Sequence, residues 1–332
     1  MRCIMRKQVR KMWKKVDVVF KLKSPLHIGY TPFKSFVISP TRYYVPGRNF
    51  WGAITRRITE YLYEKPEPWN YKKIGRQVME GFKFSYFYIY DGRVVYFPRY
   101  TKQGLRYGNN SEEVTKSEFE RRFIGSFIST EIDSFSRTAK SGSLHELEFI
   151  NNKTRDENGN LKDVKIAGCI WIKEGTKIEN KEIILDNKGI LVEDFNTIDE
   201  LILGGESKYG FGHVVLDSIN QVVFPEYPPF RWKNPENVKI IHGEFLPAHL
   251  KYNRSLNFKG DVELLTGRGY YDPNVLKKGG NESKEDKGRE GDRPGAVISI
   301  PKYYFVPGTV VINGGEFKVE WDGTLEVRKN GK

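Results

Sequence analysis

The hydrophobic pattern of the chain predicts a set of short β-strands. Runs rich in β-branched and aromatic side chains, each bounded by turn-forming residues, occupy residues 16–22, 84–90, 93–97, 166–172 and 213–216. Such short apolar runs are typical of largely buried strands. Asp91-Gly92 separates the second run from the third and favours a tight hairpin turn. We therefore expect a β-sheet whose strands come from distant parts of the sequence.

Two segments carry the pattern of helices. Apolar side chains recur at every fourth position from Phe50 to Leu62, with Asn49 as the candidate N-cap. A shorter helix is predicted over 197–203, where Gly204-Gly205 ends it. The resulting order, strand–helix–hairpin–strand–helix–strand, is that of a ferredoxin-like βαββαβ unit with insertions.

Length and turn-rich segments divide the chain into parts. Its 332 residues fit two domains of ordinary size. We expect a basic leader at 1–15 and a ferredoxin-like domain at 16–218. The Pro-rich stretch 224–230 opens a smaller, β-rich second domain (219–332), interpreted as a degenerate ferredoxin-like sheet. Within it, 277–293 has almost no apolar residue and is expected to be mobile. The fold class is α+β.

Composition and charge narrow the function. Aromatic residues make up 14% of the chain, enough for a packed core, and no apolar run reaches the length of a membrane helix. The basic N-terminus lacks the apolar segment of a secretory signal, and the two cysteines, Cys3 and Cys169, provide neither a disulfide framework nor a four-cysteine zinc site. These features predict a cytoplasmic protein. The formal charge of +13 favours a polyanionic partner, with simple solubility as the alternative.

A glycine-rich loop at 204–212 is the most informative segment. Its glycines allow backbone conformations closed to other residues, and Lys208 adds a positive charge. The loop lacks the Gly-Lys-Ser/Thr of a phosphate-binding P-loop and the spacing of a dinucleotide fingerprint. A ligand site and a plain connecting turn remain open at this point.

This loop resembles the glycine-rich loop of the RAMP superfamily, the RNA-binding subunits of CRISPR effector complexes. Three further segments resemble motifs of the same family in the same order: 24–29, 45–54, and 132–144 followed by Glu148. The resemblance covers residues 16–216 and is strongest for subunits of type III complexes, whereas 217–332 match less clearly. The family often has a glycine two residues before Gly204, where this chain has Ile202.

The resemblance implies a fold similar to an RNA recognition motif, with the glycine loop against guide RNA and neighbouring subunits along the guide. The residues that we expect to contact RNA are Arg48, Arg56, Arg57, Arg137, Lys140, Gly204, Gly205, Lys208, Tyr209, Gly210 and Gly212. Stacking on unpaired bases is a further role for Tyr43, Tyr44, Trp51 and Tyr209. For these aromatic side chains taken singly, a place in the core is the better interpretation.

Catalysis is the less favoured alternative. His27 is a candidate general acid or base, because some family members that process guide RNA use a histidine in their first domain. In those enzymes the glycine loop lies near the C-terminus, whereas residues 213–332 follow it here. The backbone subunits that cut target RNA carry an aspartate in the loop after the first strand, and residues 30–36 contain no acid.

We therefore predict a non-catalytic guide-RNA-binding subunit of a type III complex, at the end that holds the 5′ repeat-derived tag, with no cofactor or metal. A metal-independent endoribonuclease that uses His27 and a protein-binding scaffold without RNA contact remain the alternatives.

Overall fold

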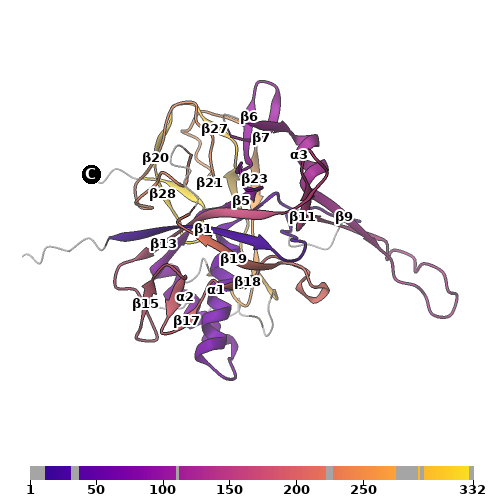
Figure 1. Cartoon of the computed structure of the whole chain (residues 1–332), viewed down its shortest axis with the longest axis horizontal. Helices are drawn as coiled ribbons and strands as arrows, with labels where there is room; N and C mark the ends of the chain where they lie inside the picture. The colour runs from indigo at the N-terminus through magenta and orange to yellow at the C-terminus, as the bar shows by residue number, and fades with distance from the viewer. Residues whose placement is uncertain are drawn as a thin grey trace, which may run out of the picture.

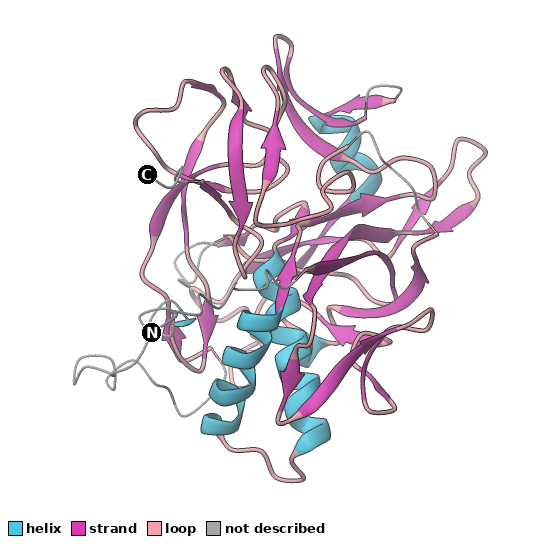
Figure 2. Cartoon of the chain, turned by 90° about the vertical axis from the view of Figure 1, so that its left-hand side faces the viewer, coloured by secondary structure: helices cyan, strands magenta, loops and turns pink. Residues whose placement is uncertain are grey.

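The computed structural model describes residues 12–30, 37–109, 112–221, 227–273, 291 and 295–328. In this part of the chain three α-helices accompany many β-strands, so the protein is α+β (Figure 1, Figure 2). The sequence prediction of the fold class is confirmed at this level.

A seven-stranded central sheet organises the molecule. Its order is β18 (Glu200–Ile202), β19 (His213–Ile219), β1 (Trp13–Leu22), β13 (Lys165–Lys173), β5 (Phe87–Tyr90) and β3 (Tyr44–Val45), and β4 (Phe82–Phe84) also pairs with β13. All of these pairings are antiparallel. The four predicted strands at its centre are confirmed, and β1 begins three residues earlier than the pattern indicated. The predicted partner of β5 forms only a bridge between Tyr90 and Val95.

Two helices cover one face of this sheet. They are α1 (Gly47–Leu62) and α2 (Pro68–Gly81). Alternate side chains of β1, such as Val18 and Phe20, enter the same core as Ile54 of α1 and Ile74 of α2. The sequence predicted α1, which begins two residues before Asn49, but not α2. Pro68 in the first turn and a capping box between Glu67 and Asn70 mark the start of α2.

The prediction of a helix over 197–203 is wrong. This segment forms β18 and the residues before it, and Leu201 pairs with Val214 of β19. Leu201 and Leu203 are buried while Glu200 and Ile202 are exposed, which is the two-residue alternation of a strand. A small sheet precedes it where the second helix was expected: β14 (Lys177–Ile178), β15 (Lys181–Leu185), β16 (Ile190–Val192) and β17 (Phe195–Asn196).

A six-stranded sheet packs on the opposite face of the central sheet. Its order is β20 (Val238–Ile240), β28 (Gly315–Val319), β29 (Leu325–Val327), β21 (Leu250–Lys251), β26 (Lys302–Phe305) and β23 (Val262–Leu265). Trp171 and Tyr88 of the central sheet, together with Tyr86 between β4 and β5, share a buried core with Phe305 and Phe317 of this second sheet. The described part of the C-terminal region therefore consists mainly of β-strands and loops.

Shorter elements complete the described chain. They are β6 (Phe97–Thr101), β7 (Gly104–Gly108), β8 (Glu113–Thr115), α3 (Lys116–Phe123), β2 (Ile38–Ser39), β9 (Ile124–Ser129), β10 (His145–Ile150), β11 (Lys153–Arg155), β12 (Leu161–Asp163), β22 (Phe258–Lys259), β27 (Val310–Val311), β24 (Arg268–Gly269) and β25 (Val297–Ile298). Strands β9 and β10 pair and extend away from the body, and we call residues 124–150 the finger (Figure 1).

Several predicted boundaries fall outside the described residues. Of the leader 1–15, only the last residues are described, and they belong to β1 or immediately precede it. The predicted mobile loop 277–293 is described only at Gly291. Of the Pro-rich boundary, Tyr227 and Phe230 are described and buried in the shared core. The division at residue 218 stays a prediction.

Candidate nucleic-acid interface

The glycine-rich loop lies directly on the segment 24–29. The amide of Gly205 donates to the carbonyl of His27 over 2.9 Å, and the amide of Gly212 donates to the carbonyl of Pro25 over 2.8 Å. Gly204 has φ = +78°, and a Cβ at this position would lie 2.2 Å from the His27 carbonyl oxygen. Two motifs about 180 residues apart in the sequence therefore form one close backbone contact.

The outer part of the loop is exposed. Ser207–Tyr209 form a single 3-10 turn that leaves Lys208 in solvent, and Tyr209 is 76% exposed. The amides of Tyr209 and Gly210, like those of Gly205 and Gly212, donate to carbonyls of the chain itself. These four amides are therefore not available to an external ligand.

His27 joins a third motif to this contact. Its Nδ1 donates to the carbonyl of Glu148 over 2.7 Å, and the Glu148 carboxylate accepts from the amide of Thr41 over 3.2 Å. In a neutral imidazole this leaves Nε2 without a proton. The residue is only 4% exposed, and Nε2 faces Gly29. His27 therefore acts in the packing of the loop, and its near-complete burial limits contact with a substrate.

A groove of about 430 Å³ opens beside these contacts. One wall consists of the loop 28–30, the first turns of α1, and Gly204 with Gly205; the other consists of 265–268 with Ser299, Lys302 and Tyr304 from the C-terminal region. The positively charged side chains that line it are Arg42, Arg48, Arg56, Arg268 and Lys302. Asp322 is the acid among its described lining residues. A cleft with this excess of cations attracts phosphate groups.

Two of these cations lie deep in the groove. Arg48 donates to Ser299 Oγ over 2.8 Å and lies against Gly267, so it connects α1 to the opposite wall. Burial lowers the pKa of Arg48, and the carboxylates of Asp322 and Asp272 oppose that effect. Arg42 is almost fully buried and forms an ion pair with Glu263 over 2.5 Å. Both guanidiniums contribute positive charge at the base of the groove, but they are buried and bonded within the chain.

Arg56 and Arg57 are adjacent in α1 but differ in their surroundings. Arg56 lines the groove, with its side chain 59% exposed in an i,i+4 pair with Glu60. Arg57 donates to the carbonyls of Asn196 and Glu200 and pairs with Asp199, which fastens α1 to the strand β18. Arg56 is thus available to a phosphate, while the Arg57 guanidinium is already engaged within the chain.

The structure does not bring Arg137 and Lys140 to the groove. Both lie near the tip of the finger, where Lys140 pairs with Glu131 over 3.1 Å. Arg137 has φ = +55°, and its amide donates to the backbone carbonyl of Asp133. The Asp133 carboxylate accepts from the amide of Ser136, and no ion pair between Asp133 and Arg137 is described.

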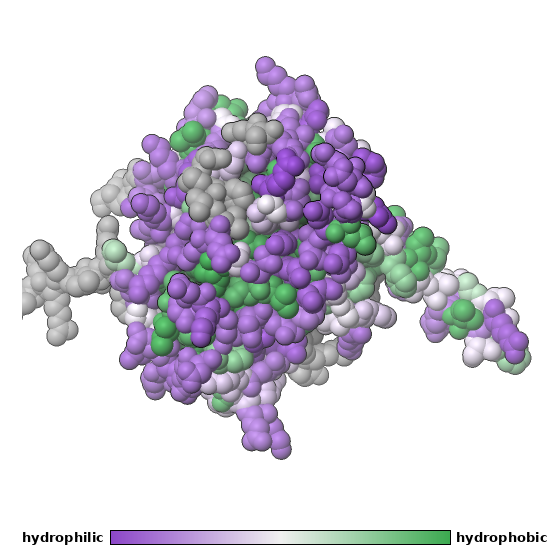
Figure 3. All heavy atoms as spheres, viewed as in Figure 1, coloured by the Kyte–Doolittle hydropathy of each residue, from purple (hydrophilic) through white to green (hydrophobic). Residues whose placement is uncertain are grey.

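The finger also exposes apolar side chains. These are Phe127, Ile128, Ile132, Phe135 and Leu144. Figure 3 shows hydrophobic and hydrophilic atoms side by side along this projection. Arg137 and Lys140 therefore form, if they contact RNA, a part of the surface separate from the groove.

Three of the four aromatic candidates pack inside the protein, and one is exposed. Tyr44 and Trp51 are buried, and the Trp51 indole donates to the carbonyl of Gly75 over 2.9 Å. Tyr43 packs against Phe119 with ring centroids 5.4 Å apart. Of the four, Tyr209 is the one with an exposed ring, so it alone keeps a face for stacking.

Sequence reasoning missed the second wall of the groove. Lys302 and Arg268 come from a region where no motif was found, and Arg42 lies between two motifs without belonging to either. The pairing of β23 with β26, which places Lys302 opposite Leu265, is what brings this wall together. Nothing in the local pattern of residues 262–305 indicates that partner.

Other kinds of site find no support in the described residues. Within the ranges that the structure describes, no three His, Cys, Asp or Glu side chains come together as a metal would require. Among the described helices, none combines the length and the apolar character needed to cross a membrane.

Comparisons with known proteins give only remote likenesses. No family model matches the chain, and no curated protein matches its sequence. Three solved structures similar to it are chains of the Type III-B Cmr-beta complex. In two cryo-EM structures, one bound to cognate target RNA and one to cognate target RNA and AMPPnP, the identity is 12%, the coverage is 90% of this chain and 86% of that chain, and the TM-score is 0.46. In the apo state the identity is 11%, the coverage is 62% and 97%, and the TM-score is 0.36.

These chains belong to type III complexes, the class that the sequence motifs resemble. With TM-scores below 0.5 they assign no function to this chain, and its function is argued from its own residues.

Proposed function

We propose that this chain is a non-catalytic subunit of a type III CRISPR interference complex and holds guide RNA in the groove beside the glycine loop. One observation carries the proposal: motifs at 24–29, 45–54 and 204–212, which resemble those of RNA-binding subunits, meet at a single cleft lined with positive charge. The motif at 132–144 leads into β10, whose Glu148 carbonyl orients His27 at the same place.

We infer that the central sheet is a modified ferredoxin-like unit. The spatial order β19-β1-β13-β5, with α1 between β1 and β5 in the sequence, agrees with the order of the four strands in that fold. The small sheet β14–β17 replaces its second helix. The two core clusters use opposite faces of this sheet, so an RNA strand is expected at its edge loops and not on its open face.

The groove fits a sugar–phosphate strand better than a small neutral ligand. Arg56 and Lys302 stand at its walls with exposed side chains, and Lys208 lies on the adjoining loop. Cations at such positions bind phosphates without reading base sequence. Tyr209 adds an exposed ring for one unpaired base.

We further propose that the subunit occupies the end of the complex that holds the 5′ repeat-derived tag, with other type III subunits as partners. Support comes from the long region after the glycine loop and from the absence of an acid at 30–36, where the target-cutting subunits carry an aspartate. Residues 31–36 lie outside the described part of the chain.

The salt dependence of RNA binding tests the proposal. We expect the affinity of the full chain, alone or in its complex, for guide RNA to fall linearly with salt on logarithmic axes. Changing Arg56 and Lys302 together to Gln removes two phosphate contacts and lowers the slope by about 1.4, at ~0.7 per phosphate on a single strand. Lys102→Gln, which removes one charge outside the groove in the turn between β6 and β7, is the control and should leave the slope unchanged. An unchanged slope in the double variant, or an equal decrease in the control, would contradict the assignment.

Incubation with repeat RNA in the absence of metal distinguishes the endoribonuclease alternative. We expect the RNA to stay intact, because His27 is buried and its Nδ1 is committed to the Glu148 carbonyl. The products are analysed on a denaturing gel, with His27→Ala in parallel. Site-specific cutting that disappears in His27→Ala would overturn the non-catalytic part of the proposal. RNA affinity with no cutting would instead exclude both the nuclease and the scaffold without RNA contact.

A further inference from the structure

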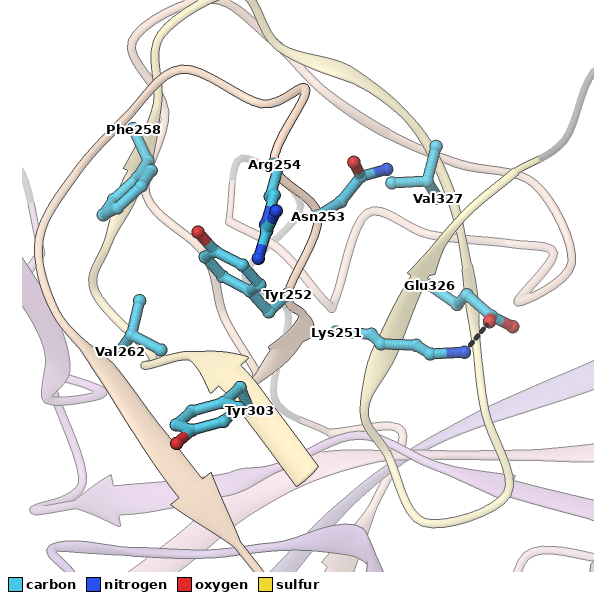
Figure 4. A pocket seen from close by; sticks show the side chains of 9 residues that line it. All are labelled: Lys251, Tyr252, Asn253, Arg254, Phe258, Val262, Tyr303, Glu326 and Val327. Carbon is cyan, nitrogen blue, oxygen red and sulfur yellow. Dashed lines mark hydrogen bonds and ion pairs between the residues drawn. The ribbon is translucent and has the colours of Figure 1, made fainter. Parts of the chain in front are cut away.

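A second concavity lies on the C-terminal sheet, outside the groove. It encloses about 910 Å³, and its lining includes Tyr252, Phe258, Val262 and Tyr303 on one side (Figure 4). Lys251, Asn253 and Arg254 supply its polar groups. We call this concavity the aromatic pocket. Neither the resemblance to RNA-binding subunits nor the proposed function uses it.

The aromatic rings of the pocket pack on a buried side chain and are exposed to solvent on their other side. Phe305 is fully buried beneath them, with its ring centroid 5.2 Å from that of Tyr252 and 4.4 Å from that of Phe258. The amide of Tyr252 donates to the carbonyl of Tyr303 over 3.0 Å, which fixes the two tyrosines side by side. Tyr303 is nevertheless 61% exposed. Exposed rings on a rigid base are the arrangement on which unpaired bases stack.

Its polar groups fit a nucleotide. Lys251 is neutralised by Glu326 over 2.6 Å, whereas the Arg254 side chain has no ion pair or hydrogen bond among the described residues. Figure 4 shows the Arg254 guanidinium directed toward the Tyr252 ring. The Asn253 side-chain oxygen accepts from Ser255, which leaves the amide nitrogen free to donate. One uncompensated cation and one amide donor beside aromatic rings suit a phosphate and a base edge.

The aromatic pocket and the groove lie back to back on the same two strands. In the pairing of β23 with β26, Leu265 lies opposite Lys302 and Glu263 opposite Tyr304, while Leu264 lies opposite Tyr303. Because side chains alternate between the faces of a sheet, Lys302 and Tyr304 line the groove and Tyr303 lines the aromatic pocket. Strand β23 is at the end of its sheet, so a nucleic-acid strand that leaves the groove meets the aromatic pocket by passing around one edge.

We propose that the aromatic pocket binds an unpaired segment of the RNA that the groove holds, by stacking a base on Tyr303 and Tyr252 and pairing a phosphate with Arg254. This inference rests on the proposed function, because the groove supplies the RNA strand. It adds a contact that selects single-stranded RNA, since a base inside a duplex has no free face for these rings.

Affinity for oligouridine measures the contact. Tyr303→Ala in the full chain is expected to weaken binding of a long oligouridine by about 5- to 160-fold, the equivalent of ~1–3 kcal/mol per stacked base. The slope of affinity against salt stays the same, because no phosphate contact is lost. Tyr303→Phe is expected to recover the lost affinity. Arg254→Gln is expected to lower the slope by about 0.7. Trp69→Ala, the loss of another exposed ring on α2, is the control.

Photo-crosslinking uses the unmodified chain, so its result does not depend on whether a variant folds. Oligouridine that contains 4-thiouridine is expected to form crosslinks with Tyr252 or Tyr303 under ultraviolet light, identified by mass spectrometry. Unchanged affinity in Tyr303→Ala and no crosslink in the aromatic pocket, while the Arg56 and Lys302 double variant still loses RNA, would overturn this inference and leave the proposed function standing. Absence of RNA binding by the unmodified chain and its complex would reject both.

Discussion

Replacing Glu263 by Gln is expected to lower the free energy of unfolding by about 3–5 kcal/mol, the usual cost of removing one partner of a buried ion pair. Glu263 accepts from the Arg42 guanidinium over 2.5 Å and also from His249 Nε2. The Arg42 side chain is 3% exposed, so without the carboxylate its charge stays buried and uncompensated. Urea unfolding of the two proteins measures the difference.

The Glu263 carboxylate also makes the free energy of unfolding depend on pH in the acid range. Burial raises the pKa of Glu263, but the hydrogen bond from His249 and the charge of Arg42 outweigh it and lower the pKa from 4.5 to about 2. The stabilisation is therefore complete above about pH 5 and is lost as the pH falls through 2, a change of roughly 3 kcal/mol. The difference in unfolding free energy between the natural protein and Glu263→Gln should shrink over this range.

Glu60→Gln is the matched control. It also removes the carboxylate of an Arg–Glu pair, but the side chains of Arg56 and Glu60 are 59% and 43% exposed. Such an exposed i,i+4 pair contributes no more than about 0.5 kcal/mol. Equal effects of the two substitutions, or a difference that does not change between pH 5 and pH 2, would show that the Arg42–Glu263 pair is not buried as described.

The Arg42–Glu263 pair is part of a buried network that joins the two sheets. Tyr86, between β4 and β5 of the central sheet, contacts His249 Nδ1 over 2.7 Å, and His249 donates to Glu263 of the second sheet. Burial lowers the pKa of His249, so it is neutral, with the Tyr86 hydroxyl donating to Nδ1 and Nε2–H donating to the carboxylate. The wall with Lys302 and Tyr304 belongs to the second sheet, and Arg42 and Tyr86 also line the groove, so the network connects this wall to the rest of the groove.

The sequence was sufficient for the elements with long apolar patterns. β1, α1 and β13 are each nine residues or longer, and all three were predicted from their apolar residues. The segment 197–203 has too few residues to separate a helix from a strand, and its partner β19 decided the outcome. The helix α2 was not predicted. Its buried residues Ile74 and Val78 are four residues apart, as on one face of a helix, and its N-terminal capping residues mark its start.

For the candidate site, the sequence located one wall and not the other. Glycine torsions are local, so the loop 204–212 was recognisable without its neighbours. How far a guanidinium is engaged depends on the carbonyls and carboxylates near it: Arg57 bonds to two carbonyls and to Asp199, whereas Arg56 has one exposed ion pair. Lys302 and Tyr303 carry no motif, and their positions follow from the register of β26 with β23.

Substitution of Gly204 by Ala tests the contact on which the groove depends. We expect the free energy of unfolding to fall by about 3 kcal/mol. Of this, roughly 1–2 kcal/mol comes from placing a side chain at φ = +78°. The rest comes from the new Cβ, which would lie 2.2 Å from the His27 carbonyl oxygen and must displace it from the Gly205 amide. Because Gly204 and Gly205 line the groove, RNA affinity should fall as well.

Gly210→Ala separates backbone strain from the loss of this contact. Gly210 has nearly the same torsion, φ = +81°, but a Cβ there meets nothing within 4 Å. It should therefore cost only the roughly 1–2 kcal/mol of the unfavourable torsion and leave the segment 24–29 in place. Urea unfolding and RNA titration of both variants give the comparison. If Gly204→Ala is no worse than Gly210→Ala in both measurements, the glycine loop does not need its contact with His27, and the convergence of motifs no longer explains the groove.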